Sequence, residues 1–154
     1  MPYQLQVPVL PDDCDELGHA SNMSYLRWTL AAALAHSGAV GLTAADYRAL
    51  GQSFVVRRHL LDYLRQALPG EALVVETRVV RLSGASSQRQ TLIYRVQGRE
   101  EGLKDELKDE LIFRALTDWA FIDLRSGRPT RIPADIRARF AVDPLVEAGV
   151  PTGG

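Results

Sequence analysis

The chain has 154 residues and a nearly balanced charge, with a formal net charge of −1 at pH 7. This length suits one domain with an ordinary core, and the balanced charge argues against a general nucleic-acid binder, which needs a basic excess. No apolar run reaches the ~20 residues that a membrane-spanning helix requires.

Cysteine usage and the first residues bear on the cellular compartment. Cys14 is the only cysteine, so no internal disulfide can form within the chain. The segment from Met1 to Gln4 lacks the basic start and long apolar core of a secretory signal. Both features fit a reducing environment, so we expect a cytoplasmic protein with no membrane or nucleic-acid partner.

The first elements in chain order are a strand and a long helix. Residues 3–9 alternate apolar and polar side chains, which predicts a strand. Residues 22–37 predict a helix, with Ser21 or Asn22 as N-cap and Gly38 just past its end. Because this helix is apolar on most of its sides, we expect it to be buried on most of its sides.

A short helix and four strands follow. Residues 43–51 predict the helix, with Thr43 as its cap. The predicted strands cover residues 54–66, 72–82, 87–97 and 111–123. One long helix and one antiparallel sheet make an α+β domain, in which the helix must serve as the core of the sheet.

The remaining segments predict little regular structure. Residues 133–141 indicate a short terminal helix that begins at Pro133, which would close a single domain over residues 1–141. The tail over residues 142–154 has no periodicity, and we expect it to be loose. Residues 103–111 contain a near-duplication of Leu-Lys-Asp-Glu. It reads as a solvated extension of the last hairpin or as a short amphipathic helix.

The most informative stretch precedes the long helix. Residues 13–28 place two acids, a glycine, a histidine, an asparagine and a tyrosine at the turn into that helix. An acid there lies beside the helix N-terminus, where free backbone N–H groups and the macrodipole favour negative charge. A substrate carbonyl would meet a carboxylate and an N–H donor together, which is the pair that acyl transfer needs.

The order of residues in this stretch carries a family resemblance. The motif consists of Asp13, Asp15, Gly18, His19, Asn22 and Tyr25. Its spacing resembles the signature of hotdog-fold acyl-CoA thioesterases of the 4-hydroxybenzoyl-CoA thioesterase-like family, and the similarity extends over residues 3–140. The resemblance implies a hotdog fold, an antiparallel sheet wrapped around one long central helix. It also implies a homodimer or homotetramer whose active site lies where two sheets meet.

Asp15 is the candidate for the reacting group. An aspartate at such a turn is by itself usually a surface or capping residue. The resemblance instead implies the catalytic carboxylate, as a nucleophile or as a general base on water, and both roles stay open. By the same resemblance the Asn22 backbone holds the oxyanion. His19 either orients Asp15 or the substrate carbonyl, or merely stabilises the loop.

Six further residues are candidates for substrate binding. They are Gly18, Tyr25, Trp28, Phe54, Arg57 and Arg58. The glycine permits a turn and a close approach of ligand, the aromatics suit an apolar acyl or aryl group, and the arginines suit the phosphates of CoA. Each of them is explained equally by an ordinary turn, core or surface position.

The predicted activity is hydrolysis of an acyl- or aryl-CoA or acyl-carrier-protein thioester to a free acid and a thiol. No metal or other cofactor is expected, because three scattered histidines and one cysteine give no ligand spacing. One alternative is a hotdog dehydratase or hydratase, whose Asp-x-Asn-Pro-x-His pattern is missing between Asp15 and His19. The other alternative is a non-catalytic acyl-CoA-binding module.

Overall fold

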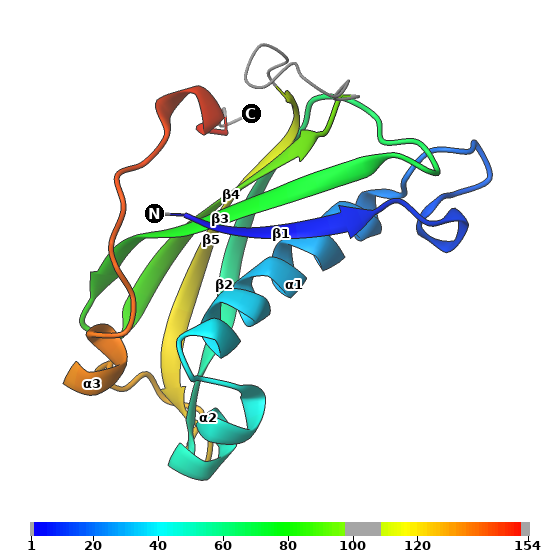
Figure 1. Ribbon diagram of the computed structural model, residues 1–154. Coiled ribbons are helices and arrows are strands. Elements are labelled where there is room, and N and C mark those ends of the chain that lie inside the picture. Colours follow the sequence, from blue (N-terminus) through cyan, green and yellow to red (C-terminus); the bar gives the residue numbers. More distant parts are fainter. Residues whose placement is uncertain (1, 98–108, 152–154) are drawn as a thin grey trace.

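The computed structural model describes residues 2–97 and 109–151, and in this part of the chain it contains one five-stranded antiparallel sheet. The long helix α1 (Asn22–Ala39) lies against one face of the sheet (Figure 1). The strands are β1 (Tyr3–Pro8), β2 (Gln52–Tyr63), β3 (Ala72–Ser83), β4 (Ser86–Arg95) and β5 (Glu110–Asp123). This arrangement confirms the α+β hotdog architecture expected from the sequence.

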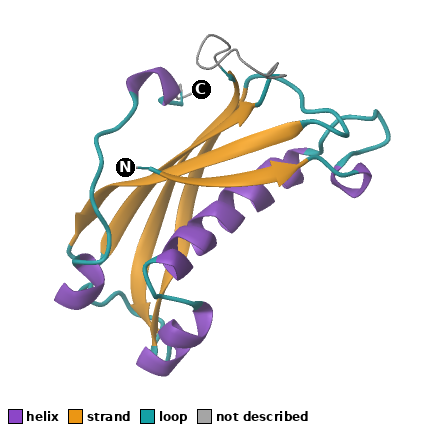
Figure 2. Cartoon of the chain, viewed as in Figure 1, coloured by secondary structure: helices purple, strands orange, loops and turns teal. Residues whose placement is uncertain are grey.

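The sheet has the strand order β1-β3-β4-β5-β2, so β1 and β2 form its two edges. Its register shifts between Val56 and Arg58 in β2 and between Val79 and Arg81 in β3. Such bulges bend a strand and increase its twist, which helps the sheet to curve around a helix. Figure 2 shows the strands fanning across α1 as one layer.

Helix α1 begins where the sequence predicts and ends later. Ser21 is the N-cap, and its Oγ accepts a hydrogen bond from the Ser24 backbone N–H at 3.3 Å. The predicted end at Gly38 is wrong, because the helix continues to Ala39. Gly38 keeps helical geometry, whereas Gly41 has a φ of +85° that ordinary side chains avoid, and the chain leaves the helix there.

One apolar cluster holds α1 on the sheet, and a second lies past the end of the helix. Tyr25, Trp28 and Ala32 of α1 pack with Ile93 and Phe113 of the sheet. The second cluster includes Leu42, Tyr47, Phe121, Ile136 and Phe140. The core of the protein therefore continues beyond the C-terminal end of α1.

Two short helices complete the second cluster. Helix α2 (Ala44–Leu50) is capped by Thr43, as the sequence predicts. Helix α3 (Ala134–Arg137) begins just after Pro133 and is shorter than the predicted terminal helix. No helix in the described part of the chain is both long and apolar enough to cross a membrane.

The C-terminal tail differs from expectation over residues 142–151. It bridges Val79 on β3, and the buried Gln90 side chain exchanges two hydrogen bonds with the Val146 backbone at 2.8 and 2.9 Å. Because a side-chain amide supplies both a donor and an acceptor, it can hold an irregular segment that shows no periodicity. Residues 152–154 and most of the near-duplication, residues 103–108, lie outside the described residues.

Candidate active site

The motif loop between β1 and α1 is closed by its own backbone. Cys14 and Ala20 face each other as an isolated bridge, and the Asp15 N–H donates to the His19 carbonyl at 2.8 Å. The Gly18 N–H donates to the Asp15 carbonyl at 3.0 Å, and Gly18 has a φ of +79°. This left-handed conformation explains why glycine occupies the position. The loop therefore presents Asp15 on a rigid turn.

The Asp15 carboxylate is held at one oxygen and available at the other. Its Oδ1 accepts a hydrogen bond from the Leu17 backbone N–H at 2.9 Å. Its Oδ2 has no hydrogen-bond partner among residues 2–97 and 109–151, and the residue is exposed. Asp15 lines a pocket of about 270 Å³. The group is thus oriented by the backbone yet free to meet a water molecule or a carbonyl carbon.

The neighbouring aspartate has a different environment. Asp13 Oδ2 accepts a hydrogen bond from the Leu10 N–H at 2.9 Å, and Oδ1 pairs with Arg27 Nη2 at 2.6 Å. Its carbonyl accepts a bond from Ser24 Oγ at 2.7 Å. Both carboxylate oxygens of Asp13 are therefore used to hold the loop, which leaves Asp15 as the better candidate for chemistry.

The first turn of α1 adds hydrogen-bond donors beside Asp15. Asn22 lines the same pocket. The backbone N–H groups of Asn22 and Met23 have no acceptor within the described part of the chain, as expected for the first turn of a helix. Together with the helix macrodipole, these N–H groups favour an oxyanion at this position.

The far wall of the pocket comes from the end of β2 and the loop after it. The Tyr25 hydroxyl accepts a hydrogen bond from the Ala67 N–H at 2.9 Å and donates to the Arg65 carbonyl at 3.1 Å. Tyr63 Oη donates to the Asn22 carbonyl at 3.3 Å. Burial raises the pKa of the Tyr25 phenol, which keeps it protonated and able to donate. These contacts fix the wall relative to the helix start.

The structure brings most of the predicted catalytic region together. Asp15, His19, Asn22 and Tyr25 all line the 270 Å³ pocket, with Gly18 in the same loop. His19 forms no side-chain hydrogen bond to Asp15 within the described residues. Its role in orienting the carboxylate therefore stays a prediction, as do the other catalytic and substrate-binding roles.

Four predicted substrate-binding residues lie elsewhere. Trp28 is 5% exposed and packs edge-on against Tyr25 in the core, with the two ring centroids 5.4 Å apart. Arg57 and Arg58 are exposed on β2. Phe54 lines a different pocket at the other end of α1. Because strands rise ~3.3 Å per residue, Phe54 lies ~30 Å along β2 from Tyr63, so the end of the strand reaches the Asp15 pocket and its beginning does not.

Sequence reasoning missed Tyr63, and Arg65 was only one of several strand arginines suited to the phosphates of CoA. Both line the pocket, and the Arg65 guanidinium lies 3.3 Å from Glu110. The run of residues 54–66 reads as one strand, and nothing in its pattern shows which end meets the motif loop. The answer depends on how β2 pairs with β5 in the sheet, and a single sequence does not show which strands pair.

Two other chemistries find little support at the site. Partial burial, with Asp13 and Asp15 beside it, raises the pKa of the Cys14 thiol, which opposes a thiolate nucleophile. In the described part of the chain, no three or more histidine, cysteine, aspartate or glutamate side chains are grouped so as to hold a metal ion.

Comparisons with known proteins place this geometry in a family. The sequence model of the thioesterase-like superfamily matches residues 9–140, and the chain belongs to that family. No curated protein matches the chain. Membership of the family, together with a thioesterase among the structural neighbours that is 27% identical, assigns the protein to the thioester hydrolases.

Solved structures show the same fold. A thioesterase from Thermus thermophilus, complexed with coenzyme A and zinc, is 27% identical, with a TM-score of 0.70 and coverage of 88% of this chain and 94% of that one. The 1,4-dihydroxy-2-naphthoyl-CoA thioesterase of Synechocystis is 16% identical, with a TM-score of 0.78 and coverage of 90% and 95%. The dynemicin thioesterase is 17% identical, with a TM-score of 0.79 and coverage of 95% and 99%.

Proposed function

We propose that the protein hydrolyses an acyl- or aryl-CoA thioester, or the corresponding acyl-carrier-protein thioester, with Asp15 as the reacting carboxylate. The observation that carries this proposal is the free Oδ2 of Asp15 in a pocket beside the first turn of α1. A carboxylate and unpaired N–H donors at one place match the two requirements of acyl transfer.

The proposed reaction begins with the thioester carbonyl at the start of α1. The backbone N–H of Asn22 stabilises the oxyanion, and Asp15 acts in one of two ways. As a nucleophile it attacks the carbonyl carbon, the thiolate leaves with the electron pair, and water then hydrolyses the mixed anhydride. As a general base it takes a proton from water, which attacks directly. Both routes give a free acid and a thiol.

Charged and aromatic groups around the pocket support a CoA-type substrate. Tyr63 and Arg65 line the pocket beside Asp15, and Arg65 is exposed. An exposed guanidinium suits the phosphates of CoA. Arg57 and Arg58 lie farther along the same strand, β2, and we retain them as phosphate contacts in an assembly of two chains.

The assembly that we propose is a homodimer or homotetramer. Strand β2 is an edge of the sheet, because within the described residues it pairs only with β5. A long free edge is a ready surface for pairing with a second chain. Light scattering should give a mass at least twice the 17.0 kDa of one chain. An active species with the mass of one chain would reject the proposal.

We also infer a cytoplasmic location, which is supported by the single cysteine, because one cysteine cannot form an internal disulfide.

A panel of thioesters tests the proposed activity against the alternatives. The panel contains acyl-CoA thioesters of graded chain length, aryl-CoA thioesters and acyl-carrier-protein thioesters, with release of the thiol as the readout. Hydrolysis of at least one class supports the proposal. Binding without turnover would indicate an acyl-CoA-binding module, and hydration of an enoyl-CoA without thiol release would indicate a hydratase.

A further inference from the structure

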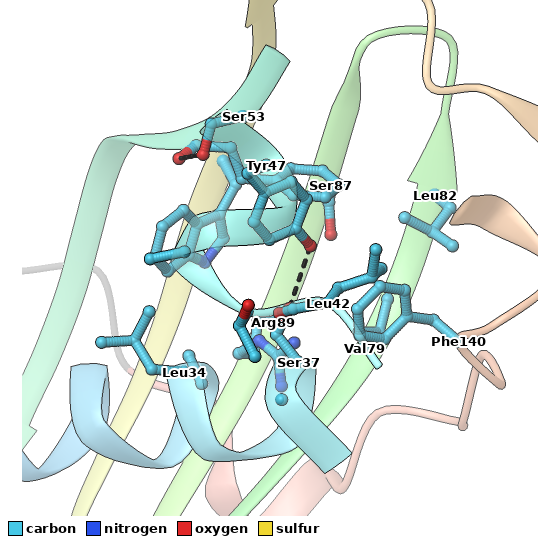
Figure 3. A pocket seen from close by; sticks show the side chains of 16 residues that line it. Leu34, Ser37, Leu42, Tyr47, Ser53, Val79, Leu82, Ser87, Arg89 and Phe140 are labelled. Carbon is cyan, nitrogen blue, oxygen red and sulfur yellow. Dashed lines mark hydrogen bonds between the residues drawn. The ribbon is translucent and has the colours of Figure 1, made fainter. Parts of the chain in front are cut away.

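A second pocket lies at the C-terminal end of α1. It has a volume of about 300 Å³ and shares no lining residue with the Asp15 pocket. Figure 3 shows side chains from α1, α2 and the sheet surrounding this space, with Phe140 from beyond α3 at its side. Most of the wall is apolar and is formed by Leu34, Leu42, Phe54, Val79, Leu82 and Phe140.

One lining residue is a buried cation. Arg89 on β4 is only 7% exposed. Its Nη1 donates to His36 Nδ1 at 2.9 Å and to Thr77 Oγ1 at 3.0 Å. Burial lowers the pKa of Arg89 to about 10, so the guanidinium remains charged at neutral pH. The pocket therefore has a positive charge within an apolar wall.

The residues that contact Arg89 do not neutralise it. Burial and the adjacent guanidinium lower the pKa of His36 to about 4, so this imidazole is neutral and accepts the hydrogen bond. Stacking on Tyr3, with ring centroids 5.3 Å apart, and an edge contact with Phe140 at 5.4 Å hold the ring in place. Asp143 raises the pKa of His36, but its effect is smaller than the lowering caused by burial and by Arg89.

Other shielded arginines of the protein have acidic partners. Arg78 pairs with Glu76, Arg95 with Glu71 at 2.9 Å, and Arg114 with Asp62 at 2.9 Å. In residues 2–97 and 109–151, no carboxylate lies within ion-pair distance of Arg89. A buried charge without a counter-charge is unfavourable, and a bound anion would relieve that cost.

The donors that Arg89 leaves unused form a binding edge. Nη1 uses its two N–H groups on His36 and Thr77, whereas Nε and Nη2 have no acceptor in the described chain. A guanidinium edge of this kind binds both oxygens of a carboxylate. The Trp119 indole N–H is also buried without a partner among the described residues, and Trp119 lines the same pocket.

Hydroxyl groups add to the polar part of the wall, and five lining residues carry one: Ser37, Thr43, Tyr47, Ser53 and Ser87. Tyr47 Oη and Ser37 Oγ lie 2.9 Å apart, and the dashed line in Figure 3 marks this contact next to Arg89. Ser37 also donates to the Leu42 carbonyl at 2.7 Å, so its oxygen accepts the bond from Tyr47. Arg89 thus has hydroxyl groups near it, and the apolar residues of the wall suit hydrocarbon.

We propose that this pocket binds an apolar carboxylate, with its two oxygens on Nε and Nη2 of Arg89 and its hydrocarbon against the apolar wall. The site is separate from the Asp15 pocket, because Asn22 and Ser37 lie ~22 Å apart along a helix that rises ~1.5 Å per residue. The ligand is a free acid, because an acyl chain of eight carbons on a thioester held at Asp15 is too short to reach Arg89 in the same chain.

Three variants isolate the proposed contacts. Arg89→Met removes the charge and keeps a similar side-chain length. Gly38→Leu fills the pocket from α1, where an added Cβ meets nothing within 4 Å and the backbone is helical. Arg81→Met is the matched control, since Arg81 is an exposed arginine on the adjacent strand β3 and does not line the pocket.

Titration calorimetry with octanoate and octanol on the purified full chain tests the proposal. We expect saturable octanoate binding to the wild type and to Arg81→Met, and binding at least ~10-fold weaker in Arg89→Met, the loss typical of a charge-assisted hydrogen bond. Gly38→Leu should remove it, and octanol should bind the wild type at least ~10-fold more weakly than octanoate.

Three results would overturn the proposal: no saturable octanoate binding to the wild type, equal binding of octanol, or unchanged octanoate binding in Arg89→Met. Circular dichroism checks that each variant is folded. If Arg89→Met does not fold, two other measurements test the proposal. They are the preference of the wild type for octanoate over octanol and the loss of octanoate binding in Gly38→Leu. This test needs no catalytic activity, so it stands apart from the proposed function.

Discussion

The two ends of helix α1 carry opposite charges in opposite surroundings. At the N-terminal end, the Asp15 carboxylate is exposed, held by one backbone hydrogen bond and open at its second oxygen. At the C-terminal end, the Arg89 guanidinium is buried in an apolar pocket with an open edge. An exposed, backbone-fixed carboxylate suits reaction with water, whereas a buried cation suits selective binding of an anion.

The two ends also differ in how they are built. The Asp15 end is formed largely by one continuous loop and the first turn of the helix, residues 13–25, braced by the wall after β2. The Arg89 end draws its walls from α1, α2 and several strands of the sheet. Local hydrogen bonds therefore place the reacting group, and tertiary packing shapes the second pocket.

Removing one tyrosine hydroxyl at each end of α1 compares how much hydrogen bonding stabilises the two ends. Tyr25→Phe leaves the buried Ala67 N–H and the Arg65 carbonyl without their partner, so it should lower the free energy of unfolding by about 1–3 kcal/mol. Tyr47→Phe removes a bond to Ser37, which keeps its own acceptor, so the loss should be about 0.5–1.5 kcal/mol. Urea denaturation of both variants gives the two values. A larger loss for Tyr47→Phe would contradict the picture of the N-terminal end as the one tied by hydrogen bonds.

Acid should destabilise the Arg89 end through His36. The unfolded imidazole takes up its proton near the ordinary pKa of 6.5, whereas the folded one does so only near pH 4. Between these values the unfolded chain binds more protons, so stability should fall as the pH is lowered from about 6.5 to about 4.

Urea denaturation across this pH range measures the free energy of unfolding of the wild type and of His36→Gln. The value for His36→Gln should fall less as the pH is lowered. Burial also lowers the pKa of His59, so His59→Gln serves as the comparison and should leave most of the decline in place. An identical pH dependence in the wild type and His36→Gln would exclude His36 as the source.

A small effect is expected at the cap of α2, near the Arg89 end. Thr43 accepts a bond from the Asp46 N–H, and the Thr43 N–H and hydroxyl both donate to the Asp46 carboxylate. These bonds lower the pKa of Asp46. Thr43→Ala should cost about 1 kcal/mol of stability and raise the Asp46 pKa. Urea denaturation and an NMR titration measure both, and an unmoved Asp46 pKa would count against the capping box.

The sequence predicted those features that depend on local pattern. Alternation located the strands, and the Ser21 and Thr43 caps located two helix starts. Gly38 was misjudged as a helix end because a glycine with helical backbone geometry and one with a positive φ look alike in a sequence. The packed tail was missed because the side chain of Gln90 holds it, far away along the chain.

The candidate site shows the same limit. The resemblance singled out Asp15, but the residues alone do not show that Asp13 is fully occupied while Asp15 is half free. Tyr63 reaches the pocket and Phe54 does not, because the direction and length of β2 decide which residue meets the loop. Arg89 was one of several strand arginines in the sequence, and only the packing shows that it is buried.

The proposed activity depends on Asp15 as the reacting carboxylate. The most direct test compares Asp15→Asn with Asp12→Asn in single-turnover hydrolysis of the best thioester, with substrate affinity measured separately. Asp12 is an exposed acid in the same loop that does not line the pocket, so it controls for the loss of one charge at this end of the helix. We expect the chemical step to be at least ~10²-fold slower in Asp15→Asn, with substrate binding retained, and a near-normal rate in Asp12→Asn. A near-normal rate in Asp15→Asn, or equal losses in the two variants, would contradict it.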